Sequence, residues 1–309
     1  MLDFIAVPFG YAMRFIYDMV GNYGLSIILF TLFTQLVLLP LNWKQKKGMV
    51  DVQRIQPKMM ELQKKYANNR DKYAQEVQKL YDEQGVSPMT GCLPMLLTFP
   101  IMIGLYYVVA RPLTYFMGLN SDQISTLAKA LKVTATNPYT LEIALAGELS
   151  ANFATAKDIV PGLMQVNFNF LGLNLAKTPS FKDFSVLWII PILSGATAYM
   201  QSWVMRKMQQ RQGAVQDGAM NTQNAMMNIM MPAMSIYFGF ILPAGLGVYW
   251  IARNVFTVGQ DLILTPYFIR KSREKEAALL AAKPQKKKKA EPQQLTEGEQ
   301  PPKDDEENR

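Results

Sequence analysis

The chain has 309 residues, of which 50% are hydrophobic and 18% charged, and its formal net charge is +8. It contains no histidine and one cysteine, Cys92, which removes the commonest metal ligand and general base and excludes an intrachain disulfide. The charges lie in blocks between uncharged stretches long enough to cross a bilayer, which favours an integral membrane protein over a pair of soluble domains.

Residues 1–23 mix large apolar side chains with Asp3, Arg14 and Asp18, and they lack the basic start of a secretory signal. The mixture predicts an amphipathic helix that lies on the membrane surface. We therefore expect the first membrane crossing to begin after this segment.

Five apolar segments are predicted to cross the membrane as helices, which makes the expected fold class an all-α integral membrane protein. They cover residues of about 25–42, 92–110, 184–205, 224–242 and 244–264, within a membrane core of residues 24–264. The last two form one long uncharged run that Pro243, Gly245 and Gly247 are expected to break into two helices joined by a tight turn. Cys92, at the start of the second segment, is expected to be a small buried hydrophobe.

The segment of about residues 43–86 is predicted to form a helical hairpin with its turn at 67–69. Apolar residues recur at helical spacing in both arms, at Ile55, Met59, Leu62, Tyr66, Val77, Leu80 and Tyr81. The outer face is mostly Lys, Gln and Glu, which is typical of a solvated hairpin and is also compatible with a docking arm for cytosolic partners.

Basic residues predict the orientation of the chain in the membrane. They gather in the hairpin segment, in the link after the third span and in the tail, beginning with Lys44, Lys46, Lys47, Arg206, Lys207, Arg211, Arg270 and Lys271. By the positive-inside rule these three segments are cytoplasmic. The loop of about residues 111–183 and the N-terminus are then outside, and the C-terminus is inside.

Two segments outside the spans have a distinct composition. Phe168–Leu175 alternates apolar and polar residues and is either a short strand or an interfacial segment leading into the third span, and we favour the interfacial segment. The tail of residues 265–309 is predicted to be basic, cytoplasmic and, from about Glu274, disordered. Its cluster Lys286, Lys287, Lys288 and Lys289 suits RNA or anionic lipid, or serves as a topology anchor and solubility tail.

Two predicted spans carry side chains that are costly in hydrocarbon. Gln35 lies about eleven residues from the outer end of the first span, and Arg253 lies about nine from that of the fifth, so at 1.5 Å per residue both are near mid-bilayer. Arg253 follows Tyr249 and Trp250 by one turn and shares their helix face. Thr31 is one turn before Gln35 and faces the same way.

Several blocks of sequence resemble the YidC/Oxa family of membrane protein insertases, over about residues 23–267. They are Gly85–Pro88, Gly91–Pro94 with Pro100–Ile101, Leu39–Leu41, Gln56–Lys58, and Pro243–Leu246 followed by Tyr249, Trp250 and Asn254. Each block is weak alone, and their shared order and spacing make the match specific. The N-terminus is similar to the short, Gram-positive-like bacterial form, which lacks a large periplasmic domain, and it has no lipoprotein cysteine.

The resemblance implies an insertase of the bacterial cell membrane and no enzyme chemistry. Five helices are expected to surround a hydrophilic groove that is open to the cytoplasm and to lipid and closed on the outside. A nascent membrane protein is expected to enter this groove, with the Sec translocon or without it. The implied partners are the lipid bilayer, the ribosome, and the Sec translocon or signal-recognition machinery, and no cofactor, nucleotide or metal is implied.

The implied groove departs from the family pattern at one position. Many members carry an arginine five residues before the proline that here is Pro40, and this chain has Gln35 there, which keeps hydrogen bonding without charge. We hypothesise that Arg253 supplies the missing charge; the alternative is that it pairs structurally with an acid or with carbonyl groups. The full set of predicted groove residues is Thr31, Gln35, Gln201, Tyr249, Trp250, Arg253 and Asn254. Interfacial or core packing is the alternative role for Thr31, Tyr249 and Trp250. Gln201 has a lower claim, and its alternative is a position near the cytoplasmic surface.

Two other classes of protein were weighed against the insertase. An intramembrane protease is disfavoured because the chain has no histidine, and the predicted spans have no lysine and no Gly-x-Ser-x-Gly motif. A channel or small-solute transporter is compatible with Gln35, Arg253 and Asn254, but the chain has no visible internal repeat and carries a large basic hairpin that a solute path does not need. Deletion of residues 45–85 distinguishes the two, because only an insertase needs the hairpin.

Overall fold

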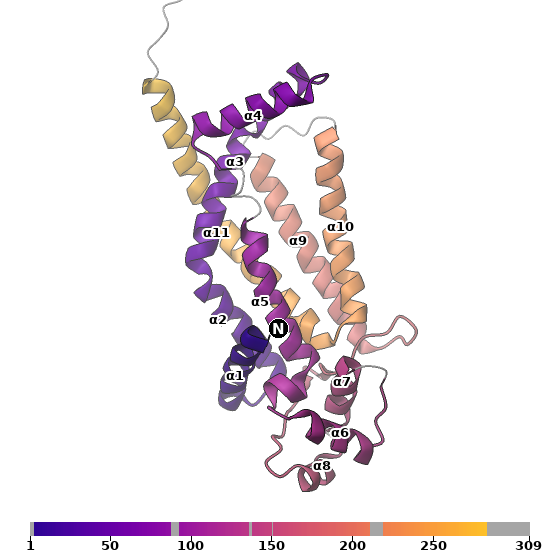
Figure 1. Ribbon diagram of the computed structural model, residues 1–309. Coiled ribbons are helices and arrows are strands. Elements are labelled where there is room, and N and C mark those ends of the chain that lie inside the picture. Colours follow the sequence, from indigo (N-terminus) through magenta and orange to yellow (C-terminus); the bar gives the residue numbers. More distant parts are fainter. Residues whose placement is uncertain (1–2, 88–92, 136–137, 150, 211–218, 283–309) are drawn as a thin grey trace, which may run out of the picture. The chain divides into compact units, whose positions relative to one another are not determined.

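The computed structural model is mostly helical, as predicted, and describes residues 3–87, 93–135, 138–149, 151–210 and 219–282 (Figure 1). The chain divides into two compact units, Met1–Ser272 and Arg273–Arg309. The described helices are α1 (Asp3–Val20), α2 (Tyr23–Val37), α3 (Leu39–Lys65), α4 (Arg70–Gln84), α5 (Leu93–Ala110), α6 (Ser121–Ala130), α7 (Pro138–Leu149), α8 (Phe153–Ile159), α9 (Ile189–Gln210), α10 (Ala219–Ile241) and α11 (Ala244–Ala282). A π-helical turn, η2 (Pro112–Phe116), follows α5, and a 3₁₀ turn, η3 (Val186–Trp188), precedes α9.

Helix α1 is packed on one side and exposed on the other, which agrees with the amphipathic helix predicted there. Its buried residues are Ala6, Gly10, Met13 and Tyr17, and its exposed face includes Phe4, Tyr11, Phe15 and Met19. The phenol of Tyr115 in η2 donates a hydrogen bond of 2.6 Å to Asp3, and this bond lowers the pKa of the Asp3 carboxyl. Burial and the same bond raise the pKa of Tyr115 to about 12. Location of α1 at a membrane surface stays a prediction.

The predicted first span is divided by a bend. Helix α2 ends at Val37, α3 begins at Leu39, and the two axes meet at 63°. Pro40, in the first turn of α3, has no N–H to donate to the carbonyl of Leu36, so the helix cannot continue in register through this point. Two polar side chains from either side of the bend face each other, as described below.

The hydropathy of the described helices gives one candidate crossing. Within the described ranges, no single helix is both long and apolar enough to span a bilayer, whereas α2 and α3 pass the criterion together as a bent pair. Phe99–Ala110 and Ile229–Ile241 are shorter apolar helical segments.

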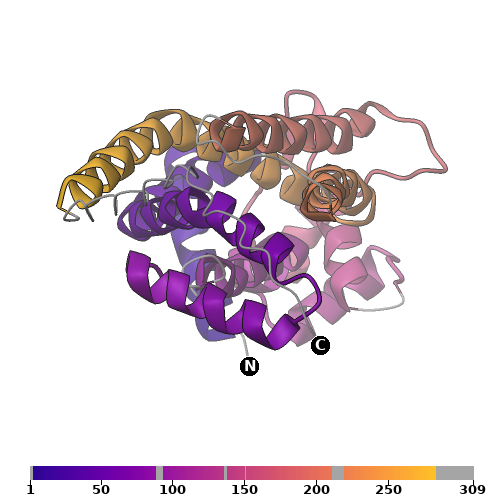
Figure 2. The ribbon, with the colours of Figure 1, turned by 90° about the horizontal axis from the view of Figure 1, so that it is seen from above.

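The helical hairpin predicted after this bend is confirmed. Helix α3 ends at Lys65, the side chain of Asn69 caps α4 by accepting a hydrogen bond of 3.0 Å from the Lys72 N–H, and α4 folds back beside α3 (Figure 2). Gly85, with φ of 61°, ends α4 in the left-handed conformation that favours glycine. Helix α3 is continuous from the bend to the hairpin turn, and Pro57 lies inside it.

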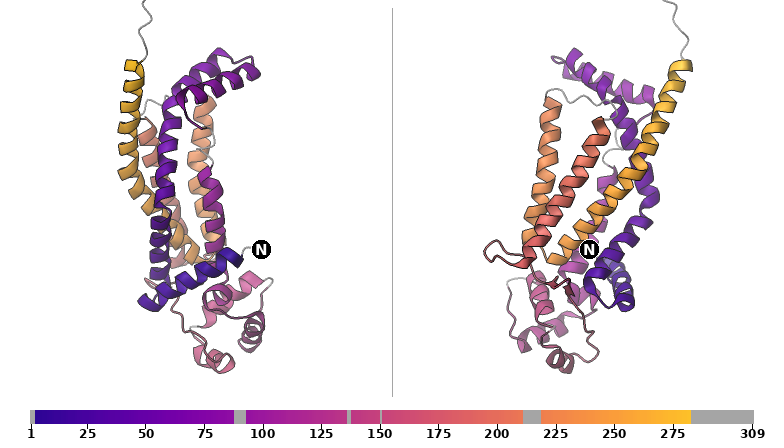
Figure 3. Two further views of the ribbon diagram at one scale, coloured as in Figure 1. Left: turned by 60° about the vertical axis from the view of Figure 1, so that its left-hand side comes forward. Right: turned by 180° about the vertical axis from the view of Figure 1, so that it is seen from behind.

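The largest cluster of buried apolar side chains joins α1, α2, α5 and the start of α11 to the segment between α5 and α9. Helices α6, α7 and α8 gather at the end of the Met1–Ser272 unit opposite the α3–α4 hairpin, and α9 and α10 pack side by side (Figure 3). The break between α10 and α11 falls at Pro243, where the sequence predicted it.

Two sequence-based expectations are corrected. Residues 168–175, which we favoured as an interfacial segment, form an antiparallel hairpin of β1 (Asn169–Phe170) and β2 (Leu173–Asn174). Its turn uses positive φ at Leu171 and Gly172, of 52° and 81°, and the flanking Phe168 and Leu175 are buried in the main cluster. The alternation of apolar and polar residues was thus a strand signal.

The second correction concerns the tail. Disorder was predicted from about Glu274, but α11 continues to Ala282, because Glu, Lys, Ala and Leu in this stretch are strong helix formers. Residues 283–309, with the cluster 286–289, lie outside the described residues, as does Cys92.

A buried carboxylate ties α7 to the end of α5. Glu142 is 1% exposed, and its Oε1 accepts hydrogen bonds from Arg111 Nε at 2.8 Å and from the Thr114 hydroxyl at 2.7 Å. Its Oε2 accepts the backbone N–H of Thr114 at 2.9 Å. Removing one member of a buried, hydrogen-bonded ion pair leaves its partner unsatisfied.

We therefore expect Glu142→Gln to lower the free energy of unfolding in detergent by about 3 kcal/mol. Glu148→Gln is the matched control, because Glu148 is exposed on the same helix, and it should change stability by less than about 0.5 kcal/mol. Thermal unfolding followed by circular dichroism measures both, and equal losses in the two variants would contradict the assigned role of Glu142.

Gly10 permits close approach of α1 to η2. A Cβ at this position would overlap the carbonyl oxygen of Tyr115, whereas a Cβ at Gly259 in α11 meets nothing within 4 Å. Gly10→Ala is expected to lower stability by about 1–3 kcal/mol, and Gly259→Ala to raise it slightly. Melting temperatures of the two variants in one detergent test the difference, and a stabilised Gly10→Ala variant would refute the close contact.

Candidate functional site

Three amide side chains meet where α2, α3 and α11 come together. Asn42 Nδ2 donates to Gln35 Oε1 at 3.3 Å and to Gln260 Oε1 at 3.5 Å. The first bond crosses the bend between α2 and α3, and the second reaches α11, 218 residues away in the chain. We call Gln35, Asn42 and Gln260 the amide cluster; its Gln35 is only 8% exposed.

An ion pair continues the same contact between α3 and α11. Lys46, one turn after Asn42, pairs through Nζ with Oδ1 of Asp261, and the two side chains are 9% and 0% exposed. The other carboxylate oxygen of Asp261 and the hydroxyl of Thr265, one turn further on, are buried without a hydrogen-bond partner in the described part of the chain. This arrangement holds two charges away from solvent and makes each depend on the other.

Aromatic and polar contacts extend this junction along α3. The rings of Trp43 and Phe268 lie edge to face with centroids 5.0 Å apart, and the Ser272 hydroxyl donates to Asp51 at 3.3 Å. We call the whole contact between α3 and α11, from the amide cluster to Ser272, the α3–α11 seam. The seam fixes the part of α3 nearest the bend against α11.

Arg253 shares a face of α11 with the amide cluster. It precedes Gln260 by seven residues, close to two full helical turns, so both side chains project from the same side of the helix. Arg253 is half-buried, and no acid lies within ion-pair distance of it among the residues that the structure describes. The structural pairing with an acid, weighed as an alternative from the sequence, has no counterpart in these residues.

Thr31 and Tyr249 are enclosed in the protein. The Thr31 hydroxyl is fully buried and donates to the carbonyl of Ile27 at 2.7 Å. Tyr249 is 5% exposed and belongs to the main apolar cluster, and Trp250 packs against that cluster with its ring 6.2 Å from Phe238. All three side chains are therefore packed against other parts of the protein.

Asn254 of α11 faces α9, the helix that carries Gln201. Asn254 is 7% exposed and donates to the Thr197 hydroxyl of α9 at 3.2 Å. Gln201 follows Thr197 by one turn and is half-buried. The structure thus brings Gln35 to the α3–α11 seam and places Asn254 with α9, rather than gathering all seven predicted residues in one cluster.

Sequence reasoning missed four members of the seam. The sequence places Asn42 at the end of a span, marks Lys46 only as a topology signal, and indicates no role for Gln260 or Asp261. The sequence could have paired Asn42 with Gln35, because a spacing of seven residues places both on one face of a helix. No sequence pattern indicates the Lys46–Asp261 ion pair, because its members are 215 residues apart.

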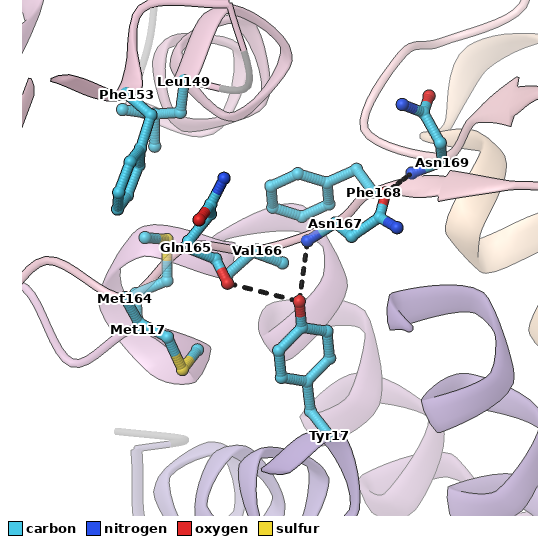
Figure 4. Close-up of a pocket in the computed structure, with 10 residues that line it drawn as sticks. All are labelled: Tyr17, Met117, Leu149, Phe153, Met164, Gln165, Val166, Asn167, Phe168 and Asn169. Carbon is cyan, nitrogen blue, oxygen red and sulfur yellow. Dashed lines mark hydrogen bonds between the residues drawn. The ribbon is translucent and has the colours of Figure 1, made fainter. Parts of the chain in front are cut away.

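A separate cavity of about 350 Å³ lies at the end of the unit that holds α6–α8 (Figure 4). The Tyr17 phenol lines it, donates to the carbonyl of Gln165 at 3.3 Å and accepts from the Asn167 N–H at 2.7 Å. None of the predicted groove residues lines this cavity. The described residues contain no cluster of Cys, Asp and Glu that would hold a metal ion.

The structure defines a helical protein with a bent apolar helix pair and a buried polar seam. Residues 15–271 match the family model described as 60Kd inner membrane protein. The chain is 35% identical to the membrane protein insertase YidC of Clostridium perfringens, over 84% of this chain and 86% of that protein. The chain therefore belongs to the 60Kd inner membrane protein family, and the resemblance inferred from its motifs is confirmed.

Other relatives differ in length. The membrane protein insertase YidC 2 of Listeria innocua is 28% identical over 89% of this chain and 75% of its own, whereas YidC of a Geobacter species is 31% identical with only 36% of its length covered. A crystal structure described as an active YidC insertase with the first transmembrane domain resolved matches 83% of this chain and 45% of that chain. The identity is 21% and the TM-score is 0.48.

The buried ion pair predicts an asymmetric response to mutation. Asp261→Leu alone leaves the Lys46 ammonium buried without a partner and is expected to cost about 3–5 kcal/mol, whereas Lys46→Met with Asp261→Leu should restore most of the loss. Unfolding of the two single variants and the double variant in detergent measures the coupling. Additive losses would show that the two charges do not stabilise one another.

Proposed function

We propose that the protein is a membrane protein insertase, which takes nascent membrane proteins into the bilayer of a bacterial cell, alone or with the Sec translocon. The observation that carries this proposal is the family match over residues 15–271, which includes the bent pair, the hairpin and α11 as far as Lys271. The action requires no bond to be made or broken, so we assign no catalytic residue.

The proposed topology has five crossings, made by α2 with the start of α3, by α5, α9 and α10, and by the first part of α11. The basic residues support a cytoplasmic α3–α4 hairpin and C-terminus. The α6–α8 segment, at the opposite end of the unit from the hairpin, is then outside (Figure 3). The ribosome, the Sec translocon and the signal-recognition machinery are the proposed partners of the hairpin and tail, and residues 286–289 are the proposed contact with RNA or anionic lipid.

The proposed groove uses the side of α2 and α11 that carries Gln35 and Arg253. A polar segment that crosses hydrocarbon leaves its backbone N–H and C=O groups without partners, at several kcal/mol each. Polar side chains placed part of the way across lower this barrier, and the final apolar helix in lipid supplies the driving force. Tyr249 and Trp250, on the same stretch of α11, form the apolar wall of this path. Thr31 lies one turn before Gln35 on α2 and supports the same side of the path. Asn254 and Gln201 are proposed to line it nearer α9.

In this proposal Arg253 supplies the charge that many family members place at the position of Gln35. Arg253 projects from the face of α11 that also carries Gln260, and Gln260 reaches the amide cluster that contains Gln35. The guanidinium is half-buried and has no described acid to neutralise it. It therefore offers an uncompensated positive charge to an acidic segment of a substrate.

Reconstitution of the full chain in liposomes tests both proposals. Insertion of a single-span substrate with an acidic outer tail, measured by protease protection, should exceed that in empty liposomes. Arg253→Ala is expected to lower the insertion rate about tenfold, because one charge-assisted hydrogen bond contributes at least about 1.5 kcal/mol. Arg253→Lys, which keeps the charge, should retain most of the activity.

Three outcomes separate the possibilities. Insertion that Arg253→Ala leaves unchanged at normal expression would keep the insertase and reduce Arg253 to a structural residue. Insertion no better than in empty liposomes, across several substrates, would refute the function. A chain shortened between residues 58 and 82 loses the hairpin but keeps the α3–α11 seam. As an insertase it should lose the insertion that depends on the ribosome or the Sec translocon, whereas transport by a solute transporter would be unaffected.

A further inference from the structure

The orientation of the Gln35 amide follows from its hydrogen bond. A glutamine amide has an oxygen that accepts and an NH₂ group that donates, and the two ends have nearly the same shape. Asn42 presents its NH₂ group to Gln35, so only the oxygen of Gln35 can satisfy the contact. No described residue accepts a hydrogen bond from Nε2 of Gln35. The end of the side chain that remains for another partner is therefore the donor.

Gln260 fixes the orientation of Asn42 in the same way. Both donor contacts of Asn42 come from one NH₂ group, which has two hydrogens, one for Gln35 Oε1 and one for Gln260 Oε1. With the oxygens of Gln35 and Gln260 both turned toward Asn42, a reversed Asn42 would place its own oxygen against two oxygens, which is repulsive. The ion pair of Lys46 and Asp261, next along the seam, keeps Gln260 within reach of Asn42.

We propose that Asn42 and Gln260 are positioning residues that hold the Gln35 amide with its NH₂ group toward the substrate path. The site then recognises acceptor oxygens of the substrate's polar segment, such as backbone carbonyls and uncharged side-chain amides and hydroxyls. This inference rests on the proposed insertase function and deepens it by naming a substrate class, segments with neutral outer tails.

Two different donors then serve two kinds of tail. Arg253 attracts carboxylates over a distance through its charge, whereas the oriented amide forms hydrogen bonds that do not depend on the net charge of the tail. A neutral amide is also less costly to keep in hydrocarbon than a second cation. Preorganisation matters for the amide because a freely rotating glutamine presents its oxygen as readily as its nitrogen.

The experiment is a double-mutant cycle in reconstituted liposomes with the full chain. Two single-span substrates differ only in the outer tail, one rich in Ser and Gln and the other in Asp. Gln35→Leu is expected to lower insertion of the neutral-tailed substrate about tenfold, and Asn42→Leu about two- to threefold, because an amide that is no longer held still presents its nitrogen part of the time. The double variant should fall no further than Gln35→Leu alone, because Asn42 acts through Gln35. The acidic-tailed substrate should lose less, because Arg253 still attracts it.

Thr34→Val is the matched control. Thr34 lies on α2 next to Gln35, and among the described residues its hydroxyl bonds only to the carbonyl of Thr31 in its own helix, at 2.9 Å. This variant should therefore insert both substrates as the wild type does. Additive losses from Asn42→Leu and Gln35→Leu, or equal losses for the two substrates, would overturn the inference. Absence of insertion by the wild-type chain would instead overturn the proposed function, and the inference with it.

A rescue variant separates positioning from folding. Arginine carries only donors and has no oxygen that could be presented wrongly, so Gln35→Arg should insert the neutral-tailed substrate without help from residue 42. We expect Gln35→Arg combined with Asn42→Leu to match Gln35→Arg alone. A loss that persists in the combined variant would show that Asn42 only stabilises the fold. If Asn42→Leu does not fold, Gln260→Leu takes its place in the same cycle, with the same outcomes.

Discussion

The candidate site depends on one buried contact between charges, that of Lys46 with Asp261. Each charge is expensive to remove from water, and neither has another ionic partner among the described residues. The pair therefore constrains α3 and α11 to meet at this point. Because Lys46 follows the bend by two turns, the constraint also sets where α2 runs relative to α11 and brings Gln35 beside Gln260.

Much of the local structure was predictable from the sequence because its causes are local. Proline and glycine break the chain at Pro243, asparagine caps α4 at Asn69, and helical spacing marks the two arms of the hairpin. The family resemblance was also accessible, since it rests on the order of short blocks. The tail of α11 was misjudged because low hydrophobicity was given more weight than the helix propensity of Glu, Lys and Ala.

The seam was not predictable, since its partners are brought together only by the fold. Gln35 and Asn42 are seven residues apart, a spacing that already places them on one face, but the 63° bend that lies between them was not predicted. Gln260 and Asp261, which contact Asn42 and Lys46, lie more than 200 residues further along the chain. The sequence did identify Gln35 and Arg253 as unusual for their surroundings. The sequence could not show that Gln35 is held by a hydrogen bond, or that Arg253 has no ionic partner among the described residues.

The continuity of α3 has a mechanical consequence. Its 27 residues form a rod of about 40 Å whose first half is held in the seam and whose second half carries the hairpin turn. Pro57 lies between the halves and has no N–H for the carbonyl of Gln53, which makes this the most pliable point of the rod. A force applied to the hairpin would therefore bend α3 at Pro57 before it disturbed the seam. The hairpin can then change its direction while the amide cluster keeps its geometry.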